Sequence, residues 1–85
     1  MKKKYFVIIG GLWFDKVNGN TYHNTKVIEC DTKNIYYTGF DYGYGSSYYY
    51  DGERYIKNNF KNYECIIING GSFYITKKEC KNKWF

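Results

Sequence analysis

An unbroken apolar run near the start of the chain constrains the fold most. Residues 5–14 read Tyr-Phe-Val-Ile-Ile-Gly-Gly-Leu-Trp-Phe. A membrane helix needs about 20 apolar residues, whereas aromatic and β-branched residues favour strands. A run without polar alternation is typical of a strand that is buried on both faces. The sequence therefore predicts a central strand, with a bulge or a close backbone approach at Gly10 and Gly11.

The residues around this run imitate a secretory leader only in part. Three lysines at positions 2–4 precede the apolar stretch, as in a signal peptide, but Asp15 and Lys16 follow it directly, without a small-residue cleavage site. We therefore expect a cytoplasmic protein with no membrane contact. Its three cysteines, which are few and odd in number, are then expected to be reduced thiols.

Two further strands are expected after the first one, in an antiparallel meander. Asn18-Gly19-Asn20 is a strong turn signal, and such turns commonly require a positive φ at the glycine. Residues 21–30 alternate along a strand, although neither of their two faces is cleanly apolar. A second turn over residues 31–34 leads to a third strand over residues 35–38, which ends at Gly39.

A loop and one helix are expected next. Residues 40–47 mix glycine and tyrosine without a strand period, so they predict a loop. Within residues 48–60, Tyr49, Ile56 and Phe60 recur at helical spacing. Ser46 or Ser47 is a candidate N-cap, and Glu53 and Lys57 form a favourable i,i+4 pair. Gly52 is unfavourable there, by about 1 kcal/mol relative to alanine.

The remaining residues predict a hairpin. Residues 65–68 are typical of a buried strand, residues 69–72 (Asn-Gly-Gly-Ser) of a turn, and residues 73–76 of a returning strand. The segment 77–85 is basic and ends in Trp84-Phe85. We therefore expect one α+β domain over residues 1–85, with a small antiparallel sheet, one helix packed on a sheet face, and the order βββαββ.

The aromatic content points to binding. Twenty of the 85 residues are aromatic and 12 of these are tyrosine, which is more than the core of so small a domain holds. Exposed tyrosine is favoured at contact surfaces because it offers a large area at a low entropic cost. We therefore expect a binding module, and its open sheet edges make a homodimer possible. A drift toward AT-rich codons explains the same surplus equally well.

The usual chemical motifs are missing. His23 and the three cysteines (Cys30, Cys65, Cys80) lack the short spacings of a zinc site. The chain has no P-loop, and nothing in its sequence places a base beside a nucleophile. We therefore expect a protein that is not an enzyme and that uses no cofactor or metal. The net charge of +5 and the aromatic residues keep a nucleic-acid-binding module as the alternative, although Arg54 is the only arginine.

The best local cluster of polar side chains lies around the first turn. Backbone amides in a turn, with lysine, asparagine and threonine beside them, are suited to an anion such as phosphate. The other interpretation is a turn whose side chains satisfy their own backbone. The candidate binding residues of this segment are Lys16, Asn18, Asn20, Thr21, Tyr22 and His23.

The segment from Trp13 to His23, with its Gly-Asn-Thr-Tyr-His sequence, resembles a pattern in small phage and prophage proteins of unknown function. The motif Tyr42-Gly43-Tyr44-Gly45, followed by Tyr48, resembles the same proteins, and the likeness covers about the first 60 residues. It implies an accessory protein in the cytoplasm of the host cell. Such a protein would block an antiviral defence system, in the manner of an anti-CRISPR protein, by binding a host protein or by sequestering its nucleotide messenger.

The resemblance adds Tyr42, Tyr44 and Tyr48 to the candidate contact residues. The polar turn and the glycine-tyrosine motif are expected at one end of the sheet, beside the start of the helix. A helix N-terminus favours an anion there, and the tyrosines are suited to stacking on a base.

Overall fold

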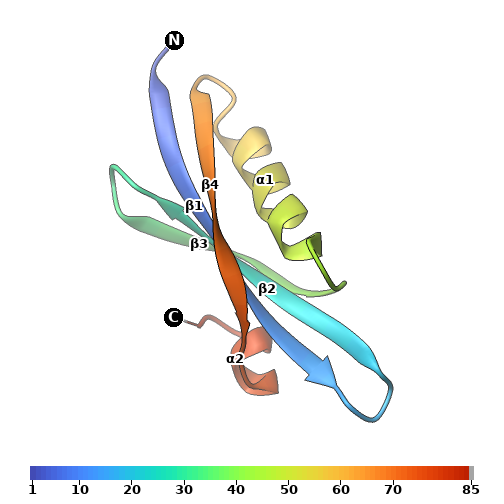
Figure 1. The fold of residues 1–85 in the computed structure, drawn as a ribbon. Coiled ribbons are helices and arrows are strands. Elements are labelled where there is room, and N and C mark those ends of the chain that lie inside the picture. The colour runs from blue at the N-terminus through green and yellow to red at the C-terminus, as the bar shows by residue number, and fades with distance from the viewer. Residues whose placement is uncertain (85) are drawn as a thin grey trace.

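The computed structural model describes residues 1–84 and contains a four-stranded mixed sheet with one long and one short helix (Figure 1). Phe85 lies outside the described residues. The sheet order is β3-β2-β1-β4, with β4 parallel to β1 and the other pairs antiparallel. The predicted α+β class is confirmed, but the sheet is mixed and the element order is βββαβα. The elements are β1 (Lys3–Asp15), β2 (Asn20–Glu29), β3 (Asn34–Tyr42), α1 (Ser47–Asn59), β4 (Glu64–Tyr74) and α2 (Lys77–Lys81).

Strand β1 has the central position that its sequence predicts, but its two faces differ. Phe6, Ile8 and Leu12 are buried on the face that α1 covers. On the opposite face Tyr5 is 47% exposed, and Val7 is only half-buried. The prediction of a strand buried on both faces is therefore wrong, because a single long helix covers one side of the sheet. We call the other side the open face.

Two glycines allow α1 to lie close against the sheet. A Cβ atom on Gly10 would lie 2.4 Å from Cγ of Tyr48, which is far inside van der Waals contact. A Cβ on Gly52 would lie 3.0 Å from side-chain atoms of Ile8 and Thr25. The close approach expected at Gly10 is thus confirmed. The same geometry explains why α1 contains a glycine that lowers its intrinsic helix propensity.

Helix α1 closely matches the segment that the spacing predicts. Ser46 is its N-cap residue, although its side chain makes no capping hydrogen bond. The Glu53–Lys57 pair is present at 3.7 Å. The fully buried face is formed by Tyr48, Gly52 and Ile56, so Tyr48 replaces the predicted Tyr49 as the innermost tyrosine. A buried Tyr48 is therefore part of the core.

Strand β4 corrects the predicted hairpin. Residues 64–74 form one continuous strand parallel to β1, and the Asn-Gly-Gly-Ser sequence forms a bulge within it. Asn69 Oδ1 accepts a hydrogen bond from the Gly71 amide at 2.9 Å, and Gly71 has a φ of +89°. Gly70 lies against β1, where a Cβ would be 2.8 Å from Cγ1 of Val7. The turn chemistry is real but local, and it bends the strand without reversing it.

Strand β3 is longer than predicted. Residues 40–42, expected in a loop, still pair with β2, because a bulge at Gly39 lets the strand continue. Gly39 has a φ of +103°, and its amide donates to Asn24 Oδ1 at 3.1 Å. The first turn is confirmed, with a φ of +70° at Gly19. The turn at the start of β3 also lies where it was expected.

The C-terminal segment forms the short helix α2, which the sequence analysis does not predict. A complete capping box between Thr76 and Glu79 starts this helix. Cys80 is buried, and Trp84 is 3% exposed and donates from Nε1 to the Asn24 carbonyl at 2.8 Å. This segment thereby covers the middle of the open face. No helix among residues 1–84 has the length and apolar character required to cross a membrane.

Candidate functional site

The two motifs of the resemblance meet in space. The Gly43 amide donates to the Thr21 carbonyl at 3.0 Å, and Nδ1 of His23 lies 3.2 Å from the Gly43 carbonyl oxygen. The rings of Tyr22 and Tyr42 contact edge to face at 5.6 Å. Four of the nine candidate residues, Thr21, Tyr22, His23 and Tyr42, are therefore neighbours across β2 and β3.

The other candidates are distributed differently. Lys16 and Asn18 lie in the turn beyond the end of β1 and β2, and Asn20 is the first residue of β2. In that turn the Asp15 carboxylate accepts from the amides of residues 17 and 18 at 3.0 and 3.3 Å and from Asn18 Nδ2 at 2.8 Å. These amides are already satisfied by an acidic side chain, so an external anion would have to displace Asp15. Tyr44 is 70% exposed.

His23 is held inside the fold. Its side chain is 1% exposed, Nε2 lies 2.6 Å from Oδ2 of Asp51, and Nδ1 faces the Gly43 carbonyl. Both ring nitrogens thus face oxygen atoms inside the fold. Burial raises the pKa of Asp51, but the hydrogen bonds from His23 and Arg54 outweigh this and hold it below 3.8. His23 therefore links β2 to α1 through its hydrogen bond to Asp51.

The same place is where a metal ion would find donors. One donor atom each of His23, Asp41 and Asp51 lie within 4.8 Å of one another. In the structure the His23–Asp51 hydrogen bond and the Asp51–Arg54 ion pair at 3.1 Å engage two of these three residues. A metal would have to replace the histidine proton and repel Arg54. The His23–Asp51 pair therefore accounts for the closeness of two of the three groups.

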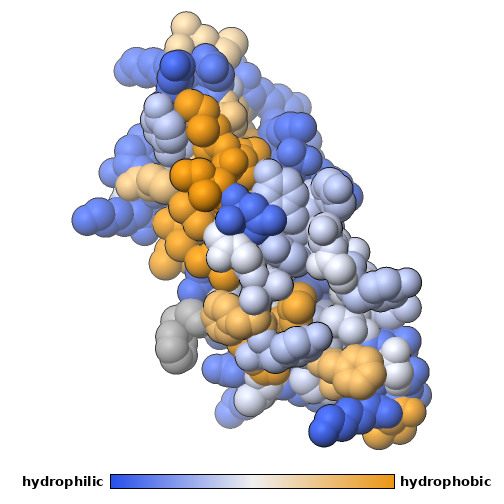
Figure 2. Space-filling model, viewed as in Figure 1, coloured by the Kyte–Doolittle hydropathy of each residue, from blue (hydrophilic) through white to orange (hydrophobic). Residues whose placement is uncertain are grey.

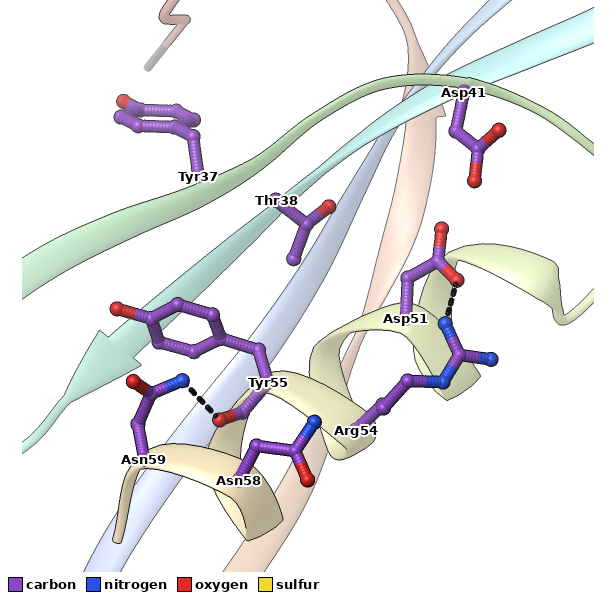
Figure 3. A pocket seen from close by; sticks show the side chains of 8 residues that line it. All are labelled: Tyr37, Thr38, Asp41, Asp51, Arg54, Tyr55, Asn58 and Asn59. Atoms are coloured by element: carbon purple, nitrogen blue, oxygen red, sulfur yellow. Dashed lines mark hydrogen bonds and ion pairs between the residues drawn. The ribbon is translucent and has the colours of Figure 1, made fainter.

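A polar cleft of about 320 Å³ lies between β3 and α1, next to this pair (Figure 3). Arg54 reaches toward Asp51, and Asn59 donates to the Tyr55 carbonyl at 2.8 Å. His23 is not part of the cleft lining, and both of its ring nitrogens face partners inside the fold, so it is not placed to act as a general base in this cleft. Its lining is Tyr37, Thr38, Asp41, Asp51, Arg54, Tyr55, Asn58 and Asn59.

A buried ion pair joins β1 to β2, and the sequence analysis does not predict it. The Lys4 ammonium is 8% exposed and hydrogen-bonds to Glu29, which is 3% exposed. Asp31 lies 3.1 Å from the same ammonium, and the Tyr36 hydroxyl donates to Glu29 Oε1 at 2.9 Å. The hydrogen bond from Lys4 is the main cause that lowers the pKa values of Glu29 and Asp31.

These carboxylates predict an acid-sensitive fold. Glu29, Asp31 and Asp51 have folded-state pKa values below their ordinary values of 4.5, 3.8 and 3.8. Their contribution is complete above those ordinary values and is lost as the pH falls through the lower, folded-state values, because the unfolded chain then binds more protons. Urea unfolding at about pH 7, 5 and 3 should therefore show stability falling mainly in the last step. A Lys4→Met variant should flatten that step, and an unchanged step would contradict the assignment.

One half of the open face presents aliphatic side chains across all four strands. The strand register aligns Ile35, Ile28, Val7 and Ile68 in one line, which we call the aliphatic row. Ile35 is 49% and Ile68 is 51% exposed, although both lie within the sheet. Figure 2 shows apolar side chains gathered along β4 and β1 on the side away from α1. This surface is apolar and unpartnered among the described residues.

The other half of the open face is aromatic and basic. The rings of Trp13, Tyr22 and Phe40, from three adjacent strands, stack with centroid distances of 5.5 and 4.8 Å. We call these three residues the aromatic ladder. The Nζ atom of Lys77 lies 5.2 Å from the Trp13 ring and that of Lys81 lies 5.5 Å from the Phe40 ring. Together with Asp15 they line a shallow pocket of about 150 Å³.

The segment from α2 to Trp84 separates the two halves. The indole of Trp84 lies over Gly11 and 4.4 Å from Nζ of Lys26. Lys26 is 7% exposed, and burial lowers its pKa. The open face therefore carries two distinct surfaces, only one of which contains residues that the sequence analysis selects.

No protein-family model, curated protein or solved structure matches this chain.

Proposed function

We propose that this chain is a non-enzymatic accessory protein that binds another protein through the aliphatic row. In the phage context implied by the resemblance of its two motifs, the partner is a protein of a host antiviral defence system, which the binding inhibits. The single observation that carries the proposal is the row itself. Four aligned aliphatic positions on an uncovered sheet face are typical of an interaction site.

The composition of the row supports a protein partner. Its side chains are aliphatic, and aliphatic surface gains most from burial against another apolar surface, at roughly 25 cal/mol per Å² of area removed from water. Tyr5, 47% exposed, precedes Val7 on the same face of β1 and extends the apolar area with an aromatic ring. A large ring beside aliphatic side chains is the composition found at the buried centre of protein interfaces.

The charge distribution indicates an acidic partner. Within residues 1–84 the carboxylate ion pairs involve only Lys4, His23, Arg54 and Lys57. The other lysines therefore give the surface most of its net charge of +5, and Lys33 lies in the turn next to Ile35. A second copy would bring like charges together at the rim, whereas an acidic protein complements them.

A non-catalytic mode of action is supported by the state of His23. The chain has one histidine, and its two nitrogens are engaged by Asp51 and Gly43. The residue most suited to general base catalysis at neutral pH therefore serves to join β2 to α1. Binding by shape and charge requires no such group.

The test compares one substitution in the row with the same substitution outside it. Tagged protein captures its partner from host lysate, and mass spectrometry identifies that partner, which is then purified. Ile68→Asp should weaken the complex at least about 100-fold, because the carboxylate would be buried without a counter-charge. Val17→Asp is the matched control, since Val17 is 91% exposed in the first turn and makes the same change of charge.

Three results would overturn this proposal. One is a purified complex whose affinity is the same for Ile68→Asp and for Val17→Asp. Another is the absence of any stoichiometric host protein in the capture. The third is a concentration-dependent dimer that Ile68→Asp abolishes, since the row would then be the interface between two copies of this chain.

A further inference from the structure

The aromatic and basic half of the open face contains a pocket that is separate from the surface proposed to bind a protein. We propose that the pocket between the aromatic ladder and α2 binds a nucleoside phosphate, either as a free nucleotide or as a unit of single-stranded nucleic acid. The aromatic side chains would contact the base, and Lys77 and Lys81 would contact the phosphate. The pocket shares no residue with the aliphatic row.

The pocket lining combines aromatic, basic and acidic groups. Three rings, two ammonium groups and one carboxylate surround about 150 Å³ of space, enough for one planar ring system or one phosphate. Aromatic rings next to lysines are the combination that binds single-stranded nucleic acid with little sequence preference, because every base has a π-face. A purely aliphatic ligand would not pair with the ammonium groups, and a simple anion would not contact the rings.

The two cations of the pocket both lie on α2. Lys77 and Lys81 are four residues apart in α2, so they project from the same side of that helix. Neither ammonium has a carboxylate within ion-pair distance among residues 1–84. Each instead lies over the edge of the aromatic ladder, near Trp13 and Phe40 respectively. A phosphate beside either ammonium would gain a charge-assisted contact.

Asp15 is the one acidic residue in the pocket lining. Asp15 would repel a phosphate if its carboxylate were directed into the pocket. Its oxygens instead accept hydrogen bonds from the turn amides and from the Asn18 side chain. Those hydrogen bonds from Asn18, with a smaller contribution from Lys77, lower the pKa of Asp15. The carboxylate is thus engaged by the turn, and the two lysines outnumber it.

Several contacts fix α2 to the sheet. Cys80, between the two lysines in sequence, is buried against the Gly11 carbonyl, and burial raises its thiol pKa to about 11. Asn24 donates from Nδ2 to the carbonyls of Cys80 and Asn82 at 3.0 and 2.6 Å. The helix that supplies both cations is therefore fixed to the sheet that supplies the rings. A fixed site loses less entropy when it binds a ligand.

The experiment uses the full chain and two probes, a deoxythymidine 12-mer and the mononucleotide dTMP. Binding is followed by intrinsic fluorescence, because Trp13 lines the pocket whereas Trp84 is buried. The double variant Lys77→Gln/Lys81→Gln should bind the 12-mer at least about tenfold more weakly. It should also reduce the slope of log affinity against log salt by roughly 1.4, which is 0.7 for each lost phosphate contact.

The matched control is Lys33→Gln/Lys61→Gln, which removes the same charge at exposed positions outside the pocket. Tyr22→Leu keeps an apolar side chain but removes the central ring, and should weaken binding roughly tenfold without changing the salt slope. Binding of dTMP that competes with the 12-mer identifies a nucleotide site, whereas binding of the 12-mer alone identifies a strand-binding site. The proposal is overturned if neither probe binds at low salt, or if the pocket and control variants lose affinity equally.

Discussion

Replacement of Gly10 by valine is expected to unfold a large fraction of the protein at temperatures where the wild type is folded. The first added carbon already lies 2.4 Å from Cγ of Tyr48, and Tyr48 is 7% exposed and cannot turn away into solvent. Overpacking typically costs about 1–3 kcal/mol, and a carbon so close to a buried ring places this variant at about 3 kcal/mol. For a domain of this size that is a fall in melting temperature of at least about 12 °C, measurable by circular dichroism.

Two companion variants make the result specific. Ser72→Val places the same side chain on the residue opposite Gly10 on β4, where the site is exposed, and should change the melting temperature little. Removing the ring in the double variant Gly10→Val/Tyr48→Ala should recover part of the loss. A double variant less stable than both single variants would show that the backbone, and not the Tyr48 ring, limits the space at Gly10.

His23→Leu is expected to be the second most damaging change. Leucine fills a similar volume, but it removes the His23 partner of the Gly43 carbonyl and of Asp51 Oδ2, and Asp51 keeps only its bond from Arg54. Leaving such partners unsatisfied costs about 2–4 kcal/mol, which denaturant unfolding measures. Asp51→Ala and the double variant complete a cycle, in which the combined loss should be clearly less than the sum of the two single losses. A His23→Leu protein with wild-type stability and impaired binding would instead make His23 a contact residue.

The central apolar strand, the first two turns and the helix could all be predicted because their signals are local. The apolar run, the Asn18-Gly19 pair and the helical spacing each act within a few residues. The hairpin at residues 69–72 could not be judged in the same way. Gly71 has a positive φ, but Gly70 is required by the β1 side chains that lie against it. That contact joins residues about 60 positions apart in sequence.

The candidate site shows the same division. The meeting of residues 21–23 with residues 42–43 follows from strand pairing, which a meander predicts. The role of His23 does not follow, since its main partner, Asp51, lies on a helix whose rotation depends on Gly10 and Gly52. The buried Lys4–Glu29 pair could not be predicted either, because a charged residue in a strand normally indicates a position exposed to solvent. The pocket was missed because Lys77 and Lys81 belong to a helix too short to give a periodic signal.

The parallel pairing of β4 with β1 also determines the order in which this chain is able to fold. Strands β1 to β3 can associate through short connections. Strand β4 follows α1 in sequence, so it can pair with β1 only after the chain has crossed over the sheet. Contacts between residues so distant in sequence form slowly. Until they form, β1 has one unpaired edge and Asn24 lacks its cover by Trp84. Folding should therefore be slow for so small a domain, and a chaperone that shields the β1 edge should raise the yield of native protein.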